Sequence, residues 1–249
     1  MNLLLLAGGG VLAGAVNAVV GSGTLLTYPL LLGAGLPPVA ANASNSMGLV
    51  PGSAFATWIY RDELSGRGPQ LKLMAGTAVV GALAGTGLVL ALPAQVFESV
   101  VPWLILSACI LVIVQPRLLA ALNSRGIDAT RLPRATLIPV LFLVGVYAGY
   151  FGAAQGIILM AVLATLYDID LQRSNAAKIV LQGVSNAAAA LLFAIAGVID
   201  WPAALAVGIG ASVGGLIGAP FARRLPPPLL RAAIVAVGLV AAIVSFSRM

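Results

Sequence analysis

The chain has 249 residues, of which 61% are hydrophobic and only 8% are charged, and its mean hydropathy is +1.08. A soluble domain carries roughly 25% charged residues, so this composition excludes a soluble protein and predicts an all-α integral membrane protein. The single Cys109 and the lack of histidine exclude a structural disulfide and most zinc or copper sites, and we expect no metal and no other cofactor. The net charge of +6 suits orientation in a membrane better than binding to nucleic acid.

A series of apolar stretches follows along the chain, each close to the roughly 20 residues that cross a bilayer as a helix. Strands that cross a membrane are shorter and alternate in hydropathy, so a barrel is excluded. No basic segment precedes the first stretch, which predicts a retained helix and not a signal peptide. The stretches are 3–20, 39–60, 71–92, 95–115, 136–152, 176–197, 202–222 and 229–247.

The chain repeats itself at a constant offset of 133 residues, at which Gly23 corresponds to Gly156. Chance matches of Ala or Leu are expected in so apolar a chain, but matches of Gly, Pro and Asn in one register indicate a gene duplication. We therefore predict two homologous transmembrane repeats, 1–116 and 136–249, joined by a linker at 117–135. The other matched positions are Asn42 with Asn175, Pro69 with Pro202, Gly81 with Gly214, Gly85 with Gly218, and Pro93 with Pro226.

The placement of basic residues predicts that the two repeats are inverted in the membrane. In the first repeat they occupy the 61–72 loop and the linker, whereas in the second they flank the 168–175 loop and fill the 223–231 loop. Because basic residues stay on the cytoplasmic side, an inverted arrangement with a cytoplasmic linker leaves only Arg248 outside. A parallel arrangement of simple spans would export the basic residues of both second-repeat loops, so inversion is preferred.

Inversion requires each repeat to cross the membrane an odd number of times, so segments 3–34 and 136–167 must each enter and return to the same side. Glycines interrupt both segments, at Gly21–Thr24 and at Gly152–Gly156, and glycine loosens a helix. We expect about four full spans plus one broken or re-entrant helical segment per repeat. Breaks of this kind commonly form the binding sites of transporters.

Polar residues at and after these breaks are the candidates for a substrate-binding site. A helix that begins at Gly23 or Gly156 leaves backbone N–H groups without intrahelical partners at the positive end of its dipole, which suits an anion. The alternative is that these glycines only allow helices to pack closely. The candidates are Ser22, Gly23, Thr24, Asn42, Ser44, Asn45, Gln155, Gly156, Asn175, Lys178, Gln182 and Asn186.

Four of these candidates are spaced i, i+3, i+7 and i+11, so they share one face of a predicted helix. Lys178 is the only cation among them, and it corresponds to Asn45 at the repeat offset. It either extends to the cytoplasmic interface or supplies positive charge to a bound anion. The four are Asn175, Lys178, Gln182 and Asn186.

Other polar or small residues have two interpretations each. Asn17 lies one turn before Gly21 and either lines the same cavity or bonds a neighbouring helix. The GxxxG runs that begin at Gly81 and Gly210 either pack helices within one chain or form a homodimer.

Particular segments of both repeats match the signature of a known family. They are 20–29, 35–38 and 41–45 in the first repeat, and 149–152, 155–156 and 171–178 in the second. These segments resemble the TauE/SafE family of sulfite exporter-like permeases, and the resemblance extends from about residue 8 to 247 and includes the duplication. It implies efflux of a small sulfur-containing or carboxylated anion, such as sulfite, sulfoacetate or thiosulfate.

The sequence therefore predicts a secondary transporter in a bacterial-type inner membrane that exports sulfite or an organosulfonate by alternating access between its repeats. A transporter or channel for thiosulfate, sulfate or a carboxylate is the alternative. A non-transporting scaffold leaves the polar residues within spans unexplained. An intramembrane enzyme fits poorly, because a Ser–His dyad needs histidine and the acids Asp168, Asp170 and Asp200 fall in predicted loops. We expect no catalytic residue and no ATP-binding motif.

Overall fold

A computed structural model describes residues 2–124, 134–167, 170–218 and 227–246. Helices joined by short connections make up this part of the chain, and it contains no strand, which confirms the all-α prediction. Most of the predicted linker, Asp168 and the basic pair Arg223 and Arg224 lie outside the described residues.

The helices differ widely in length, and the two shortest of the described α-helices have only 10 and 12 residues. In chain order the elements are α1 (Leu3–Val19), α2 (Thr24–Gly33), α3 (Pro38–Ile59), the 3₁₀ turn η1 (Arg61–Leu64), α4 (Gly68–Ala91), α5 (Ala94–Ser124), α6 (Arg134–Tyr150), α7 (Gln155–Leu166), α8 (Leu171–Ile195), α9 (Trp201–Val213), the π-helical turn η2 (Gly214–Gly218) and α11 (Pro227–Phe246).

Local sequence accounts for several helix starts. Asp170 caps α8, because its carboxylate accepts hydrogen bonds from the N–H groups of Gln172 at 2.8 Å and Arg173 at 3.4 Å. Asp200 caps α9 in the same way through the N–H of Ala203 at 2.9 Å. Proline in the first turn begins α3 and α4, where a missing N–H is tolerated.

One boundary differs from the sequence prediction. We predicted that the span after residue 95 ends at 115 and that the linker begins at 117, but α5 continues through Pro116 to Ser124. A proline inside a helix costs about 3 kcal/mol, and here the following leucine and alanine residues, which favour helix, carry α5 onward. Helical structure therefore occupies the first part of the predicted linker.

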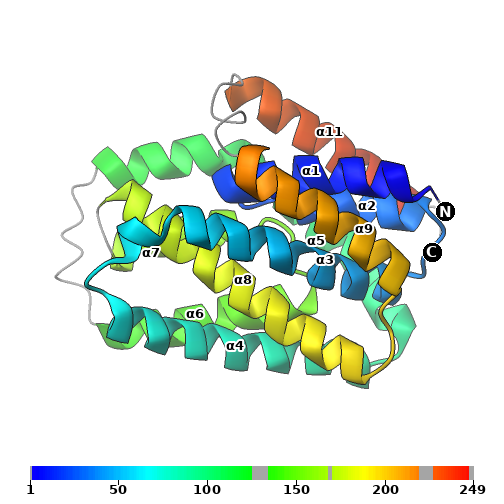
Figure 1. The fold of residues 1–249 in the computed structure, drawn as a ribbon, viewed down its shortest axis with the longest axis horizontal. Coiled ribbons are helices and arrows are strands. Elements are labelled where there is room, and N and C mark those ends of the chain that lie inside the picture. Colours follow the sequence, from blue (N-terminus) through cyan, green and yellow to red (C-terminus); the bar gives the residue numbers. More distant parts are fainter. Residues whose placement is uncertain (1, 125–133, 168–169, 219–226, 247–249) are drawn as a thin grey trace.

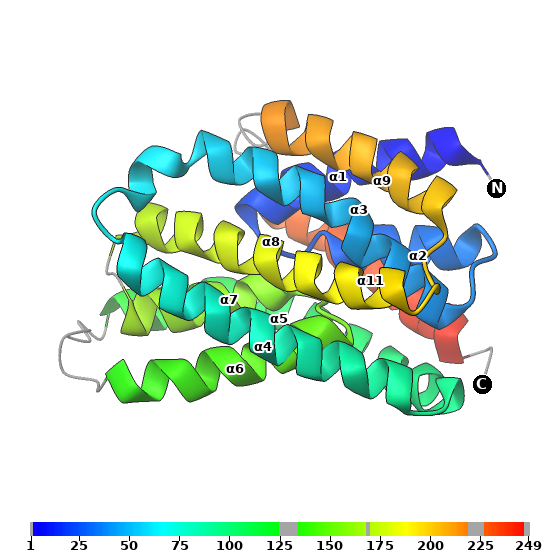
Figure 2. The same cartoon turned by 60° about the horizontal axis from the view of Figure 1, so that its bottom comes forward.

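The bounds of the helices recur at the offset of 133 residues. Shifted by this offset, α2 falls on 157–166 within α7, and α3 falls on 171–192 within α8. Contacts between the helices recur in the same way: α1 packs on α9 as α6 packs on α4, and α3 packs on α9 as α8 packs on α4. Figures 1 and 2 show the corresponding arrangement, in which α3 and α8 lie between the α1–α9 pair and the α4–α6 pair.

The surface is strongly apolar, as expected for a chain embedded in lipid. By length and composition, three of the described helices can cross a membrane: Gly68–Ala91, Ala94–Leu118 and Gln172–Ile195. Large apolar side chains project outward from most helices, among them Leu143 with 65% and Ile195 with 75% of the side chain exposed. The apolar composition and exposure of these helices place the chain in a membrane.

The GxxxG runs bring helices of the same chain into backbone contact. A Cβ added to Gly85 of α4 would lie 2.0 Å from the carbonyl oxygen of Val146 in α6, and one added to Gly214 would lie 2.0 Å from that of Val11 in α1. Small residues allow such close approach in membranes. The glycines of both runs thus pack against other helices of the same chain. The alternative, a homodimer formed through these glycines, stays a prediction.

This packing predicts opposite effects for two alanine substitutions on one helix. Gly85→Ala should lower the thermal unfolding midpoint in detergent, because overpacking costs about 1–3 kcal/mol. Gly87→Ala should leave the midpoint unchanged or raise it, because nothing lies within 4 Å of the added Cβ and alanine is the better helix former. Equal midpoints for the two variants would contradict the close α4–α6 contact.

Candidate functional site

Each repeat contains one helix break, and the two breaks have related backbone geometry. The first lies between α1 and α2 and places Gly21 at φ +83°; the second lies between α6 and α7 and places Ala154 at φ +56°. Gly21 and Ala154 correspond at the repeat offset and both have positive φ, but the second break contains a further left-handed residue, Gly152 at φ +70°, whose N–H bonds the Tyr147 carbonyl as that of Gly21 bonds the Val16 carbonyl. An alanine in this conformation costs about 1–2 kcal/mol, which marks the second break as a conformation that its surroundings enforce.

The short helices that follow the breaks cannot span the membrane. α2 has 10 residues and α7 has 12, which corresponds to about 15–18 Å at 1.5 Å per residue, against a hydrocarbon thickness of about 30 Å. Both begin within one residue of the helix starts that the sequence predicts, Gly23 and Gly156. They are half-helices whose first residues lie inside the protein, since Thr24 and Gln155 are buried.

The two breaks touch each other through their backbones. The N–H of Gly156 donates a hydrogen bond to the carbonyl oxygen of Gly21 at 3.0 Å. A Cβ added to Gly156 would lie 2.4 Å from the Cα of Gly21, and a Cβ added to Gly21 would lie 2.5 Å from the Cα of Gly156. This contact, which we call the junction, therefore requires glycine on both sides.

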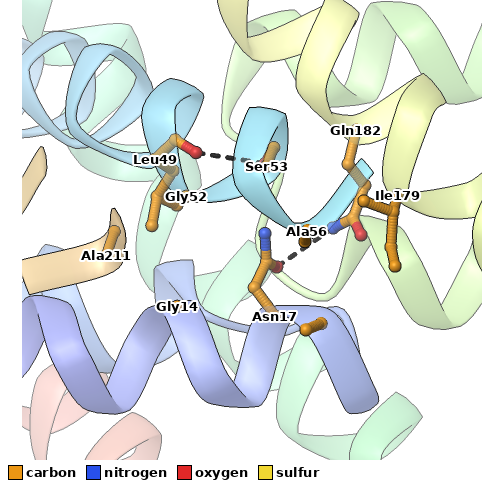
Figure 3. A pocket seen from close by; sticks show the side chains of 10 residues that line it. Gly14, Asn17, Leu49, Gly52, Ser53, Ala56, Ile179, Gln182 and Ala211 are labelled. Carbon is orange, nitrogen blue, oxygen red and sulfur yellow. Dashed lines mark hydrogen bonds between the residues drawn. The ribbon is translucent and has the colours of Figure 1, made fainter. Parts of the chain in front are cut away.

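Two amide side chains join the junction to α1 and α8. Gln182 donates from Nε2 to Oδ1 of Asn17 at 3.1 Å and to the carbonyl oxygen of Gly21 at 3.4 Å. The N–H of Gly23 donates to the same Asn17 oxygen at 3.4 Å. Figure 3 shows Asn17 and Gln182 directed toward each other from α1 and α8. The sequence left open whether Asn17 lines a cavity or bonds a neighbouring helix. It does both, because it accepts a hydrogen bond from Gln182 of α8 and lines a small cavity beside the first break.

A neutral polar cluster holds the first half-helix against α3. Asn45 donates from Nδ2 to Oγ1 of Thr24 at 3.2 Å, and its Oδ1 accepts a short hydrogen bond from the hydroxyl of Thr27. All three side chains are buried. Thr27 was not among the sequence candidates, although its position one turn after Gly23, whose carbonyl its hydroxyl also reaches at 3.2 Å, follows from helical spacing.

The corresponding place in the second repeat holds a buried cation. Lys178 corresponds to Asn45, whereas Thr24 and Thr27 correspond to the apolar Ile157 and Met160. Lys178 is 1% exposed, and it makes no hydrogen bond or ion pair with any described residue. Among the described residues it is the only buried residue with a charged side chain. A charge at this depth is expensive unless a partner neutralises it.

Lys178 lies on the same face of α8 as Gln182, one helical turn away. Because Gln182 contacts Gly21, this face of α8 looks toward the junction. The structure therefore brings Gly23, Gly156 and Gln182 together at one place and sets Lys178 one turn from it. Neither carboxylate of the capping residues Asp170 and Asp200 pairs with Lys178.

Other sequence candidates lie around or away from the junction. Asn42 donates from Nδ2 to the carbonyl oxygen of Tyr150 at 3.0 Å, which fixes α3 to the end of α6 next to the second break. Ser44 lies elsewhere: its hydroxyl accepts from the N–H of Asp200 at 2.9 Å, beside the start of α9. Gln155 is buried next to Gly156, whereas Asn175 is half-buried and Asn186 is 8% exposed.

Several buried side-chain atoms near the junction lack a hydrogen-bond partner among the described residues. They include Oγ of Ser22, Oδ1 of Asn42, Oε1 of Gln182 and Oγ of Ser185. Native proteins leave few such atoms, and each one points to strain, water, an ion or a functional role. Three of these four residues were sequence candidates.

The backbone at the start of α7 differs from the sequence expectation of open N–H groups. Gln155, Gly156 and Ile157 donate to the carbonyl oxygens of Gly152 at 3.2 Å, Gly21 at 3.0 Å and Ala154 at 3.0 Å. The second break itself supplies the acceptors for Gln155 and Ile157, and the first break supplies the acceptor for Gly156, so these donors are occupied in this conformation. The unpaired donors of this half-site are then side chains, with Lys178 the strongest.

A small cavity lies beside the junction between α1, α3, α8 and α9 (Figure 3). It measures about 10 Å³ for the centre of a water-sized sphere, which is room for about one water molecule. Its polar lining comes from Asn17, Ser53 and Gln182, and the rest is apolar or glycine. An oxyanion of several atoms does not fit into this space in the conformation described.

Comparison with known proteins gives one family and a consistent set of relatives. The family model described as "Sulfite exporter TauE/SafE" matches residues 6–245. A protein of Escherichia coli K12 named probable membrane transporter protein YfcA is 30% identical over 230 residues, covering 92% of this chain and 84% of that protein.

Two further relatives carry similar names. The probable membrane transporter protein ORF9 of a Sinorhizobium species is 26% identical, with 93% of this chain and 87% of that protein covered. A probable membrane transporter protein of Haemophilus influenzae is 26% identical, with coverages of 91% and 87%. No solved structure matches the chain.

Proposed function

Because the chain belongs to the TauE/SafE family and is therefore a membrane transporter and not an enzyme, we propose that it moves a small sulfur-containing anion at the junction of its two helix breaks. Sulfite or an organosulfonate is the proposed substrate, and export is the proposed direction. An inside-negative potential favours the exit of an anion by about 2.3 kcal/mol per charge per 100 mV. Thiosulfate, sulfate and small carboxylates are alternative substrates for the same site.

The observation that carries this proposal is the burial of Lys178 without a partner among the described residues. Lys178 also shares a helix face with a side chain that contacts the junction. A bound anion would neutralise it and offset the cost of burying the ammonium group. A neutral substrate would leave that cost in place, and a cation would increase it.

The polar atoms without partners divide into donors and acceptors with different roles. The hydroxyl groups of Ser22 and Ser185 can donate to oxyanion oxygens. The amide oxygens of Asn42 and Gln182 only accept, so they suit the Lys178 ammonium group or water that accompanies the anion. One cation with a few neutral donors favours a small anion of low charge.

The size of the cavity and the nature of the junction support alternating access. The cavity next to Gln182 admits about one water molecule, so the anion needs the breaks to separate before it can enter. The Gly156–Gly21 hydrogen bond is the contact that would open. In this proposal, movement of one repeat relative to the other exposes the site to each side of the membrane in turn.

Contacts between loops support an inverted arrangement of the repeats. Arg67, in the first basic loop, donates from Nη1 to the carbonyl oxygen of Tyr167 at 3.4 Å, beside the second basic loop. Ser44, in the second turn of α3, contacts Asp200, directly before α9, and the loops next to these two residues, 34–41 and 198–201, contain no basic residue. Loops of like charge bias therefore meet, as an inner-membrane protein with a cytoplasmic linker and inverted repeats requires.

Counterflow into proteoliposomes tests the proposal. Vesicles that contain the purified chain and are loaded with unlabelled sulfite should take up labelled sulfite with saturable kinetics, and a competing anion should inhibit whereas the neutral dimethyl sulfone should not. If the vesicles exchange only a different anion, that anion replaces sulfite as the substrate and the family assignment stands. Flux without counterflow would indicate a channel, and the lack of any flux would refute transport of these anions.

A further inference from the structure

Away from the junction, α4 and α6 enclose an open groove of about 600 Å³ on the outer surface of the protein. Leu73, Gly76 and Val80 line it from α4, and Ile138 and Phe142 line it from α6. The hydroxyl of Thr77 donates to the carbonyl oxygen of Leu73 at 2.9 Å, so this donor is used within α4. Apart from one residue at its end, the groove is therefore apolar.

That one residue is Lys72, in the second turn of α4. Its side chain is exposed and forms no ion pair with a described residue. From Lys72 to Val80 the groove follows eight residues, or about 12 Å of helix. It thus has a charged end near the start of a membrane span and an apolar end deeper within it.

The two helices present their positive ends on the same side as Lys72. A Cβ on Gly81 would meet the carbonyl oxygen of Phe142, and one on Gly85 would meet that of Val146, so α4 and α6 run in the same direction. Both N-termini consequently lie at the Lys72 end, where their dipoles favour a negative charge.

We propose that this groove binds an anionic phospholipid, with the headgroup phosphate at Lys72 and one acyl chain along Gly76 and Val80. The charge at the interfacial end selects the headgroup, and the apolar walls accept the chain. Gly76 is central to the fit, because nothing lies within 4 Å of a Cβ added there and its missing side chain leaves the space for the lipid.

The other repeat provides an internal comparison. At the offset of 133 residues, Lys72 corresponds to Leu205 and Gly76 corresponds to Ile209. These side chains project from α9 with 61% and 66% exposed. A lipid-facing surface of this protein therefore does not need a lysine or a glycine at these positions, and the pair at 72 and 76 sets the α4–α6 surface apart.

Native mass spectrometry of the full chain in detergent tests this site with two lipids of identical acyl chains. Phosphatidylglycerol should remain bound to the unaltered protein and phosphatidylcholine should not. Lys72→Leu and Gly76→Ile, which copy the counterpart residues, should each weaken phosphatidylglycerol binding, and the loss expected for Lys72→Leu is about fivefold or more. Gly87→Ile places the same side chain on α4 outside the groove and should bind as the unaltered protein does.

Three results would overturn the proposal. If the protein retains both lipids equally, the charge of the headgroup does not determine binding. If Gly76→Ile binds phosphatidylglycerol as the unaltered protein does, the lipid does not occupy the groove. Loss of a dimer in Gly76→Ile with lipid binding intact would assign the surface to a second copy of the chain. Lys72→Leu and the lipid comparison leave the backbone untouched, so they decide the matter even where Gly76→Ile folds poorly.

Discussion

Lys178→Met should lower anion counterflow by about 10- to 150-fold while leaving the protein as stable as before or more stable. A hydrogen bond to a charged group contributes about 1.5–3 kcal/mol, which corresponds to about 10- to 150-fold in binding. Methionine has a similar length and fills the same space, and replacement of a buried charge by an apolar group often stabilises a protein by about 1–4 kcal/mol. Lost transport with retained stability is the signature of a residue kept for its ligand.

Arg173→Gln is the matched control for this prediction. It removes one positive charge from the same helix at an exposed position, where the ion pair with Asp170 spans 3.9 Å and contributes little. Counterflow should stay within about twofold of the unaltered protein. If Lys178→Met transports normally, Lys178 does not contact the anion; if it unfolds, the lysine has a structural partner.

The second large effect is expected at the junction itself. Gly156→Ala should lower the thermal midpoint and abolish counterflow, because the added Cβ would lie 2.4 Å from the Cα of Gly21 and 2.9 Å from Nε2 of Gln182. Overpacking against backbone costs about 1–3 kcal/mol or more. The hydrogen bond between the breaks cannot form at 3.0 Å once they are forced apart.

Gly8→Ala serves as the control for this substitution. Gly8 lies within α1, and nothing lies within 4 Å of its added Cβ, so the change should be neutral or slightly stabilising. Thermal midpoints in detergent and initial counterflow rates, measured on both variants, separate the junction from a general intolerance to larger side chains. Normal transport by Gly156→Ala would show that the breaks need not touch.

The helix breaks could be predicted from the sequence because their causes are local. Glycines at the start of each half-helix and the offset between the repeats place both breaks within one residue of their observed positions. Lys178 could also be singled out, since a lysine within an apolar helix stands out in any sequence. The full length of α5 could not, because Pro116 suggested an end that helix-favouring residues beyond it override.

The contacts at the site depend on long-range packing, and no local pattern reveals them. The occupation of the Gly156 N–H by Gly21 joins residues that are far apart in sequence. Ser44 looks equivalent to Asn42 and Asn45 along the chain, yet the fold of α9 directs it to Asp200. Thr27 became part of the Asn45 cluster only through the way α2 packs on α3.

The central claim is that the anion sits at the junction, within reach of Lys178. Selenite is a heavier analogue of sulfite, so its anomalous scattering locates it directly in crystals of a protein that exchanges it. The account predicts one strong peak within about 3–4 Å of the Lys178 Nζ, close to Gly21 and Gly156. A peak bound elsewhere within the protein, with none at the junction, would contradict it.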